Sequence, residues 1–159
     1  MNKNFYLVLF LALVSNLAWA GNNKQIEHGK YMVTVGGCND CHTPGYLLSG
    51  GKVPVSKWLT GDSFGWNGPW GTTYPPNLRL FIDKLSEDQW VNQAKTLKRR
   101  PPMPWFNLNI MSEEDLRAMY QFIKSLGAPG KQAPAYLPPG KVPPMPYAKF
   151  PSPPPIAAK

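Results

Sequence analysis

The sequence predicts a small all-α domain followed by an extended arm. Three segments between residues 22 and 127 repeat apolar residues at the three- and four-residue spacing of amphipathic helices. Residues 43–85 are instead rich in glycine, aromatic residues and turn signals, and residues 128–159 hold 11 of the 19 prolines. Because proline lacks the N–H that helices and sheets need, we expect these last residues to form a partly polyproline II arm and no second domain.

The first 20 residues have the order of a secretory signal peptide. Lys3 supplies the charged start, residues 5–14 are apolar, and Ala18-Trp19-Ala20 places small residues at a cleavage point. We expect cleavage after Ala20, which leaves residues 21–127 as the folded domain. The alternative is an uncleaved membrane anchor, but the run is shorter than the roughly 20 apolar residues that span a bilayer. The protein is therefore expected in a periplasm.

The first predicted helix covers residues 22–35. Ile26, Gly29 and Val33 recur at helical spacing, and Asn22 or Asn23 is available as an N-cap. A glycine inside a helix costs about 0.5–1 kcal/mol relative to alanine. Gly29 therefore predicts that a second helix crosses close to this one.

Two further helices carry their own start signals. Residues 86–100 begin with a Ser86-x-x-Gln89 capping box, have acids in the first turn and end in basic residues. Residues 112–127 begin with Ser112 as the cap and end at Gly127. The predicted apolar stripes of the two helices are Trp90, Val91, Ala94 and Leu97, and Leu116, Met119, Tyr120 and Ile123.

The long segment over residues 43–85 predicts at most a small hairpin around residues 49–52. A loop of this length is uncommon in a compact domain unless it has a function or folds over something. Trp58, Trp66 and Trp70 favour the second explanation, because three short helices leave little core of their own to cover.

Residues 38–42, Cys-Asn-Asp-Cys-His, contain both cysteines of the chain. Such a pair serves as a redox disulfide, half of a zinc site, a structural bridge or a haem attachment site. A thioredoxin-like role requires a βαβ context, which is not visible here. Zinc normally takes four ligands, and the chain offers only Cys38, Cys41, His28 and His42, of which Cys41 and His42 are adjacent and fit a tetrahedral site poorly. A disulfide that closes so short a loop stabilises the fold little. Haem attachment accounts for every residue, because two thiols on one turn reach two vinyl groups and His42 reaches the iron. We therefore expect one covalently bound haem c, with a disulfide or zinc as the alternatives.

This motif, with Gly29 and Tyr31 in the helix before it and Tyr120 and Phe122 in the closing helix, resembles the single-haem class I c-type cytochromes. The resemblance covers residues 24–127. It implies the cytochrome c fold, in which three main helices surround the haem and the first and last cross almost at right angles. "PWGTTYPPNL" followed by "MPW" is also similar to haem modules in cytochrome subunits of periplasm-facing dehydrogenases, although those subunits usually carry several such modules.

Met103 is the predicted distal ligand of the haem iron. Pro101, Pro102 and Pro104 stiffen the loop around it, and electron transfer is fastest when the ligands do not rearrange. In the resembled family the distal methionine lies in a loop before the final helix, which Met103 matches. His28 is the alternative ligand. The remaining candidates fit less well: Met119 lies in an apolar stripe, Met32 is close to the attachment motif, Met111 borders a helix start and Met145 lies in the arm.

Ligation by His42 and Met103 would fill both axial positions of the iron and leave no substrate site. This predicts a one-electron carrier and no enzyme, with a potential raised by the thioether ligand. The expected donor is a periplasmic dehydrogenase and the expected acceptor is the respiratory chain. The alternative is a haem enzyme or sensor, a peroxidase or gas-binding protein, with a labile distal site. Arg79 and the aromatic N–H and O–H groups of the long loop are candidate partners of the haem propionates.

The formal net charge of +8, from 17 basic and 9 acidic residues, favours an acidic protein or anionic lipid as partner over nucleic acid outside the cell. The basic run Lys95, Lys98, Arg99 and Arg100 adjoins Met103. It is interpreted either as compensation of a helix dipole or as a surface that steers an acidic redox partner. The arm has two interpretations as well, a tether to a dehydrogenase or a disordered tail without a partner.

Overall fold

The structure is a computed structural model that describes residues 23–151. The predicted signal peptide and the N-cap at Asn22 lie outside the described residues. No helix within residues 23–151 is long and apolar enough to cross a membrane. In chain order the elements are a helix over residues 23–35, α2 (Cys38–His42), the 3₁₀ helix η1 (Val55–Lys57), β1 (Gly65–Gly68), β2 (Gly71–Thr73), α3 (Leu78–Asp83), α4 (Glu87–Thr96), α5 (Trp105–Ile110), α6 (Glu113–Ser125) and β3 (Tyr147–Lys149).

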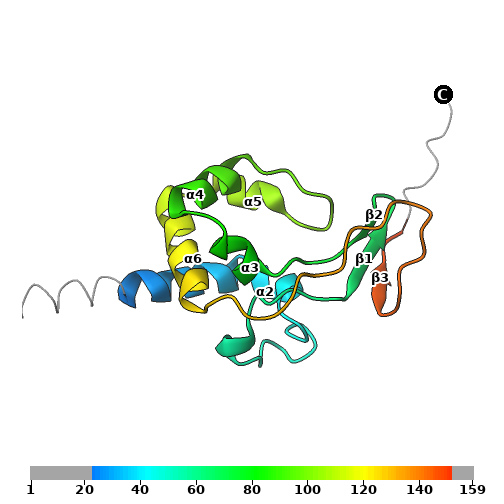
Figure 1. The fold of residues 1–159 in the computed structure, drawn as a ribbon, viewed down its shortest axis with the longest axis horizontal. Coiled ribbons are helices and arrows are strands. Elements are labelled where there is room, and N and C mark those ends of the chain that lie inside the picture. Colours follow the sequence, from blue (N-terminus) through cyan, green and yellow to red (C-terminus); the bar gives the residue numbers. More distant parts are fainter. Residues whose placement is uncertain (1–22, 152–159) are drawn as a thin grey trace, which may run out of the picture.

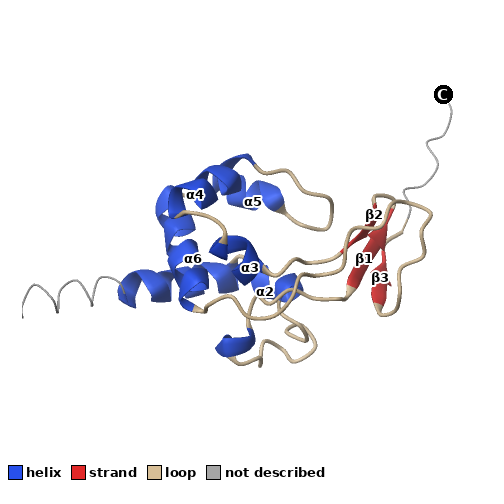
Figure 2. Ribbon diagram, viewed as in Figure 1, coloured by secondary structure: helices blue, strands red, loops and turns tan. Residues whose placement is uncertain are grey.

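The fold is mixed α/β, so the prediction of an all-α cytochrome c fold is wrong. A three-stranded sheet has the order β2-β1-β3, with β1 antiparallel to β2 and parallel to β3. Figure 2 shows the helices gathered at one end of the molecule and the sheet at the other, with long loops between them. The sheet pairs the long loop with the C-terminal arm, which are the two segments for which no strand was expected beyond the small hairpin.

The hairpin lies later in the loop than predicted. Residues 49–52 form turns without strands. The hairpin is instead formed by β1 and β2, in which Trp66 pairs with Thr73 and Gly68 pairs with Gly71. Pro69 and Trp70 make the two-residue connection, and Gly71 has a φ of 95°, which glycine adopts without steric cost.

The third strand comes from a proline-free window of the arm. Residues 147–150 contain no proline, so their N–H groups are available to a sheet. Trp66 pairs with Ala148 in the register of β1 and β3, and the Phe150 N–H donates to the Asn67 carbonyl at 2.7 Å. The expectation that prolines would keep the whole arm out of a sheet overlooked this window.

The first predicted helix is present and crosses α6 closely, as Gly29 indicates. A Cβ atom at Gly29 would lie 1.9 Å from the Ala118 carbonyl oxygen and 2.8 Å from the Phe122 Cβ. Only glycine leaves room for the α6 backbone here.

The second predicted helix has its capping box but ends early. Ser86 Oγ accepts the Gln89 N–H at 3.2 Å, and the Ser86 N–H donates to Gln89 Oε1 at 2.9 Å. The helix, α4, ends at Thr96 instead of Arg100. Pro101 explains this end, because its ring would clash with the carbonyl four residues earlier and it has no N–H to donate.

The third predicted helix, α6, runs as expected from its Ser112 cap to a left-handed Gly127 with a φ of 71°. Helices α2, α3 and α5 were not predicted, since five or six residues are too few to show a helical period.

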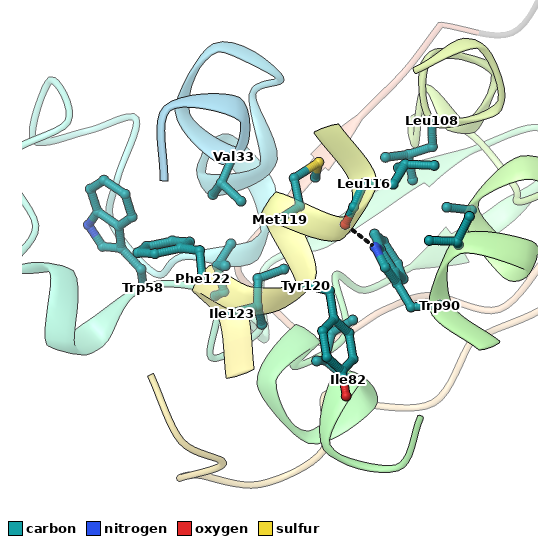
Figure 3. Packing of buried hydrophobic residues seen from close by; sticks show 13 residues of the cluster. Val33, Trp58, Ile82, Trp90, Leu108, Leu116, Met119, Tyr120, Phe122 and Ile123 are labelled. Atoms are coloured by element: carbon teal, nitrogen blue, oxygen red, sulfur yellow. Dashed lines mark hydrogen bonds between the residues drawn. The ribbon is translucent and has the colours of Figure 1, made fainter. Parts of the chain in front are cut away.

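The core lies around α6. Figure 3 shows Trp58 and Phe122 on one side of this helix and Trp90 on the other. Trp90 Nε1 donates to the Leu116 carbonyl at 2.7 Å, and the rings of Trp58 and Phe122 meet edge to face at 6.1 Å between centroids. The buried residues of this core cluster are Val33, Trp58, Leu59, Ile82, Trp90, Val91, Ala94, Leu108, Leu116, Met119, Tyr120, Phe122 and Ile123.

Candidate functional site

A cavity of about 260 Å³ lies between the helices and the hairpin. Cys38, Cys41 and His42 of α2 line it, and so does Met103 from the loop that joins α4 to α5. In Figure 1 this loop extends from the helical end of the molecule toward the end that carries the sheet. The four residues singled out in the sequence thus share one cavity, although 61 positions separate His42 from Met103.

The short helix α2 sets the spacing of the two thiols. Gly37 precedes it with a φ of 69°, and the helical repeat places Cys38 and Cys41 on one face of a single turn. Asn39 is fully buried and its Oδ1 accepts the Thr43 hydroxyl at 2.7 Å. Both cysteines are free and half-buried. Two unpaired thiols therefore face the same cavity.

His42 is held in one tautomer. Its ring is 6 % exposed, and Nδ1 lies 2.8 Å from the Pro76 carbonyl oxygen. Because a carbonyl only accepts, Nδ1 carries the proton and Nε2 keeps its lone pair. Burial lowers the pKa of His42, while the bond to Pro76 acts in the opposite direction. The imidazole is therefore neutral near pH 7, with Nε2 available to a metal ion.

Both thiols are protonated at neutral pH. Burial, followed by the charge of Asp40, raises the pKa of Cys38 to about 12. The same two causes, with Asp62 as a third, raise the pKa of Cys41. A thiolate nucleophile of the thioredoxin kind needs the opposite shift. This electrostatic setting does not favour the redox-disulfide interpretation.

Three methionines, and not one, line the cavity. Met103 lies in the loop between α4 and α5, as expected, and Met119 belongs to the buried stripe of α6. Met111 also lines the cavity, and its methyl carbon lies 3.5 Å from the place a Cβ of Gly36 would occupy. Nothing in the sequence singles out Met111 beyond its place at a helix boundary. With Met103 and Met119 it brings three thioethers to the same cavity.

Buried polar atoms without partners also mark the cavity. Within residues 23–151, Trp66 Nε1 and Tyr74 OH are buried and have no hydrogen-bond partner, and both residues line the cavity. Buried donors of this kind normally bond to protein, water or ligand. Arg99 and Arg100 line the same cavity and add positive charge. The wall can therefore receive an anionic group, as the carboxylates of a haem would require.

Arg79 and His28 lie elsewhere. Arg79 is buried outside the cavity lining and donates to the carbonyls of Gly127 at 2.8 Å and Ser56 at 2.9 Å. Its guanidinium ties the loops together and is not placed for a propionate. His28 Nε2 donates to Asp115 Oδ1 at 2.8 Å and does not line the cavity either.

The described residues offer no ligand set for zinc. No group of three or more His, Cys, Asp or Glu side chains within residues 23–151 is arranged to hold a metal ion. His28 would have to join the motif to complete four ligands, but it is bound to Asp115.

The basic run divides at the end of α4. Lys95 lies in the last turn of α4, where its positive charge compensates the dipole of that helix. Its ammonium group also donates to the carbonyl of Met111, the residue that caps α5. Lys98, Arg99 and Arg100 lie beyond the helix, in the loop that carries Met103. Of these three, Arg99 and Arg100 line the cavity.

Comparison of the chain with models of protein families, with curated proteins and with solved structures gives no significant match. A function for the chain therefore rests on its own residues and their geometry.

Proposed function

We propose that the protein is a periplasmic single-haem c-type cytochrome that transfers one electron at a time. The observation that carries this proposal is the cavity that Cys38, Cys41, His42 and Met103 share. The resemblance of the Cys-x-x-Cys-His motif to haem attachment sites supports it. The proposal includes export by the signal peptide, a dehydrogenase as electron donor and delivery to the respiratory chain.

Each residue has a defined task in this proposal. Cys38 and Cys41 would each add S–H across a vinyl group, which forms one S–C bond, moves the hydrogen to the neighbouring carbon and consumes no oxidant. His42 would bind the iron through Nε2, since Nδ1 is engaged by Pro76. Met103 would supply the second protein ligand to the iron. When bound, haem iron supplies a one-electron couple whose potential rises with a thioether ligand.

The surroundings favour a carrier. Trp66 and Tyr74 have buried donors that would serve the propionates, the role expected for the aromatic groups of the long loop. Apolar side chains such as Leu108, Met119 and Ile123 line the cavity and exclude water from it. Lys98 and Arg99 are exposed beside it and would attract an acidic redox partner.

The ligand assignment is tested on the ferric protein matured in a periplasm. We expect a weak far-red charge-transfer band from sulfur to iron in the wild type. The band should vanish in Met103→Ala and persist in Met111→Ala, which removes the other methionine of comparable exposure in the cavity wall.

Two results would contradict this assignment. Loss of the band in Met111→Ala but not in Met103→Ala would move the distal ligand to Met111. A wild type without the band that binds carbon monoxide or cyanide readily would have an open distal site. The haem enzyme or sensor alternative would then replace the carrier.

A further inference from the structure

The C-terminal arm packs along its own domain at three places. Near the start of the arm, Asn77 Nδ2 donates to the Pro129 carbonyl at 2.9 Å. Asn77 directly follows Pro76, whose carbonyl accepts a hydrogen bond from His42. Leu137 then exchanges two hydrogen bonds with Thr72, at 2.8 and 3.0 Å. Strand β3 finally pairs with β1. Figure 1 shows the arm in orange, running from the end of α6 to the sheet.

Tyr136 is the point at which the arm reaches the distal loop, defined here as residues 97–104. Its hydroxyl donates to the Trp70 carbonyl at 2.9 Å, which fixes the ring against the hairpin. The guanidinium carbon of Arg100 lies 3.9 Å from the centre of the same ring, a cation–π contact. Arg100 stands three residues before Met103. The arm thus joins the hairpin to the loop of the predicted distal ligand.

A second contact reaches the distal loop from the same side. The Thr73 hydroxyl donates to the Pro101 carbonyl at 3.0 Å. Thr73 follows Thr72, the residue that pairs with Leu137 of the arm. Two contacts therefore connect the distal loop to the hairpin. Arg100 is linked to Trp70 through the side chain of Tyr136, and Pro101 is bonded directly to Thr73.

We propose that Tyr136 is a positioning residue that holds the distal loop, and with it Met103, against the cavity. The positioning of Met103 as an iron ligand rests on the proposed function, whereas the hold on the loop does not. The arm would then hold the loop of the proposed distal ligand within the same chain. Removal of the arm would open the distal position.

Limited proteolysis tests the hold on the loop without reference to haem. In the purified full chain, trypsin should cleave after Lys98 and Arg99 about fivefold faster in Tyr136→Leu than in the wild type, as expected for loss of one cation–π contact. Tyr136→Phe keeps the ring but loses the hydrogen bond to Trp70, so its rate should lie between those of the wild type and Tyr136→Leu. Val142→Ala, at an arm residue that is 84 % exposed, should leave it unchanged.

Cyanide binding to the ferric holoprotein tests the effect on Met103. The association rate should rise about fivefold in Tyr136→Leu, and adding Arg100→Met should change it little further, because both substitutions remove one contact. Additive effects, or wild-type rates in Tyr136→Leu in either assay, would overturn the proposal. If Tyr136→Leu fails to fold by circular dichroism, the single Arg100→Met variant must show both increases, and wild-type rates there overturn the proposal equally.

The two proposals fail in different ways. A chain without bound haem contradicts the proposed function, yet its tryptic rates still report on Tyr136. A wild type with the far-red band but with equal rates in all variants keeps the haem and removes the role of Tyr136.

Discussion

At the site, burial and a single hydrogen bond determine the protonation of His42, and burial beside Asp40 determines that of the two cysteines. His42 owes its free Nε2 to the Pro76 carbonyl, 34 positions along the chain. The cysteines stay protonated because the cavity wall desolvates them beside Asp40. The sequence identifies the reactive groups, but their protonation depends on contacts that only the folded chain makes.

Asp115 gives a pH-dependent prediction. Hydrogen bonds from Ser112, at 2.6 Å, and from His28, at 2.8 Å, hold the pKa of Asp115 below its usual value. A carboxyl with a lowered native pKa stabilises the fold above its unfolded value, and this stabilisation is lost as the pH falls through the native value. Because solvent screens this surface carboxylate, Asp115→Asn should lower the free energy of unfolding by only about 0.5 kcal/mol at pH 7, and the difference should shrink below about pH 4.

Urea unfolding at pH 7 and pH 3 measures this difference. Glu114→Gln is the matched control, because Glu114 lies in the same first turn of α6 and its exposed side chain has no hydrogen bond among the described residues. An equal loss at both pH values for Asp115→Asn would show that the hydrogen bonds to its charge do not stabilise the fold.

Among helices and strands, the N-terminal helix and α6 make the most demanding contact. Gly29→Ala gains helix propensity, worth about 0.5–1 kcal/mol, but its Cβ would lie 1.9 Å from the Ala118 carbonyl. Overpacking of this kind costs about 1–3 kcal/mol or more. We expect Gly29→Ala to be less stable than the wild type by about 2 kcal/mol in urea unfolding.

Val35→Ala serves as the control for this contact. Val35 lies at the end of the same helix and is 58 % exposed, so a smaller gain in propensity should appear without a clash. A Gly29→Ala variant that is as stable as the wild type would mean that the two helices do not cross at Gly29.

The elements that could be predicted were those with local signals. The N-terminal caps and apolar stripes of α4 and α6 predicted both helices, and Gly29 predicted where the N-terminal helix crosses α6. The sheet was not predicted, because β1 and β3 pair across about 80 residues of sequence and neither strand is longer than four residues. Non-local pairing of short strands leaves no period in the sequence.

The candidate site divides in the same way. Cys38, Cys41 and His42 are adjacent in the chain, so their spacing alone points to them. Met103 was found through its prolines, whereas Met111 and the buried donors of Trp66 and Tyr74 needed the fold. Arg79 was misplaced because its carbonyl partners lie 21 to 48 residues away.

Across the whole chain, the arm and the domain form one packed unit between Pro129 and Phe150. Phe150 packs on Trp66 and Trp70, with ring centroids 6.1 and 5.2 Å apart, so the end of the described arm covers the hairpin. The residues that line the cavity lie between Gly36 and Ile123, and the haem proposal applies to the domain that contains them.

The intact mass of the protein purified from a periplasm tests the haem proposal most directly. We expect the chain from residue 21 to 159 plus one haem, retained under denaturing conditions because two S–C bonds hold it. A double variant Cys38→Ala, Cys41→Ala should show the bare chain. A wild-type mass equal to the bare chain, or lower by the two hydrogens of a disulfide, would contradict the proposal.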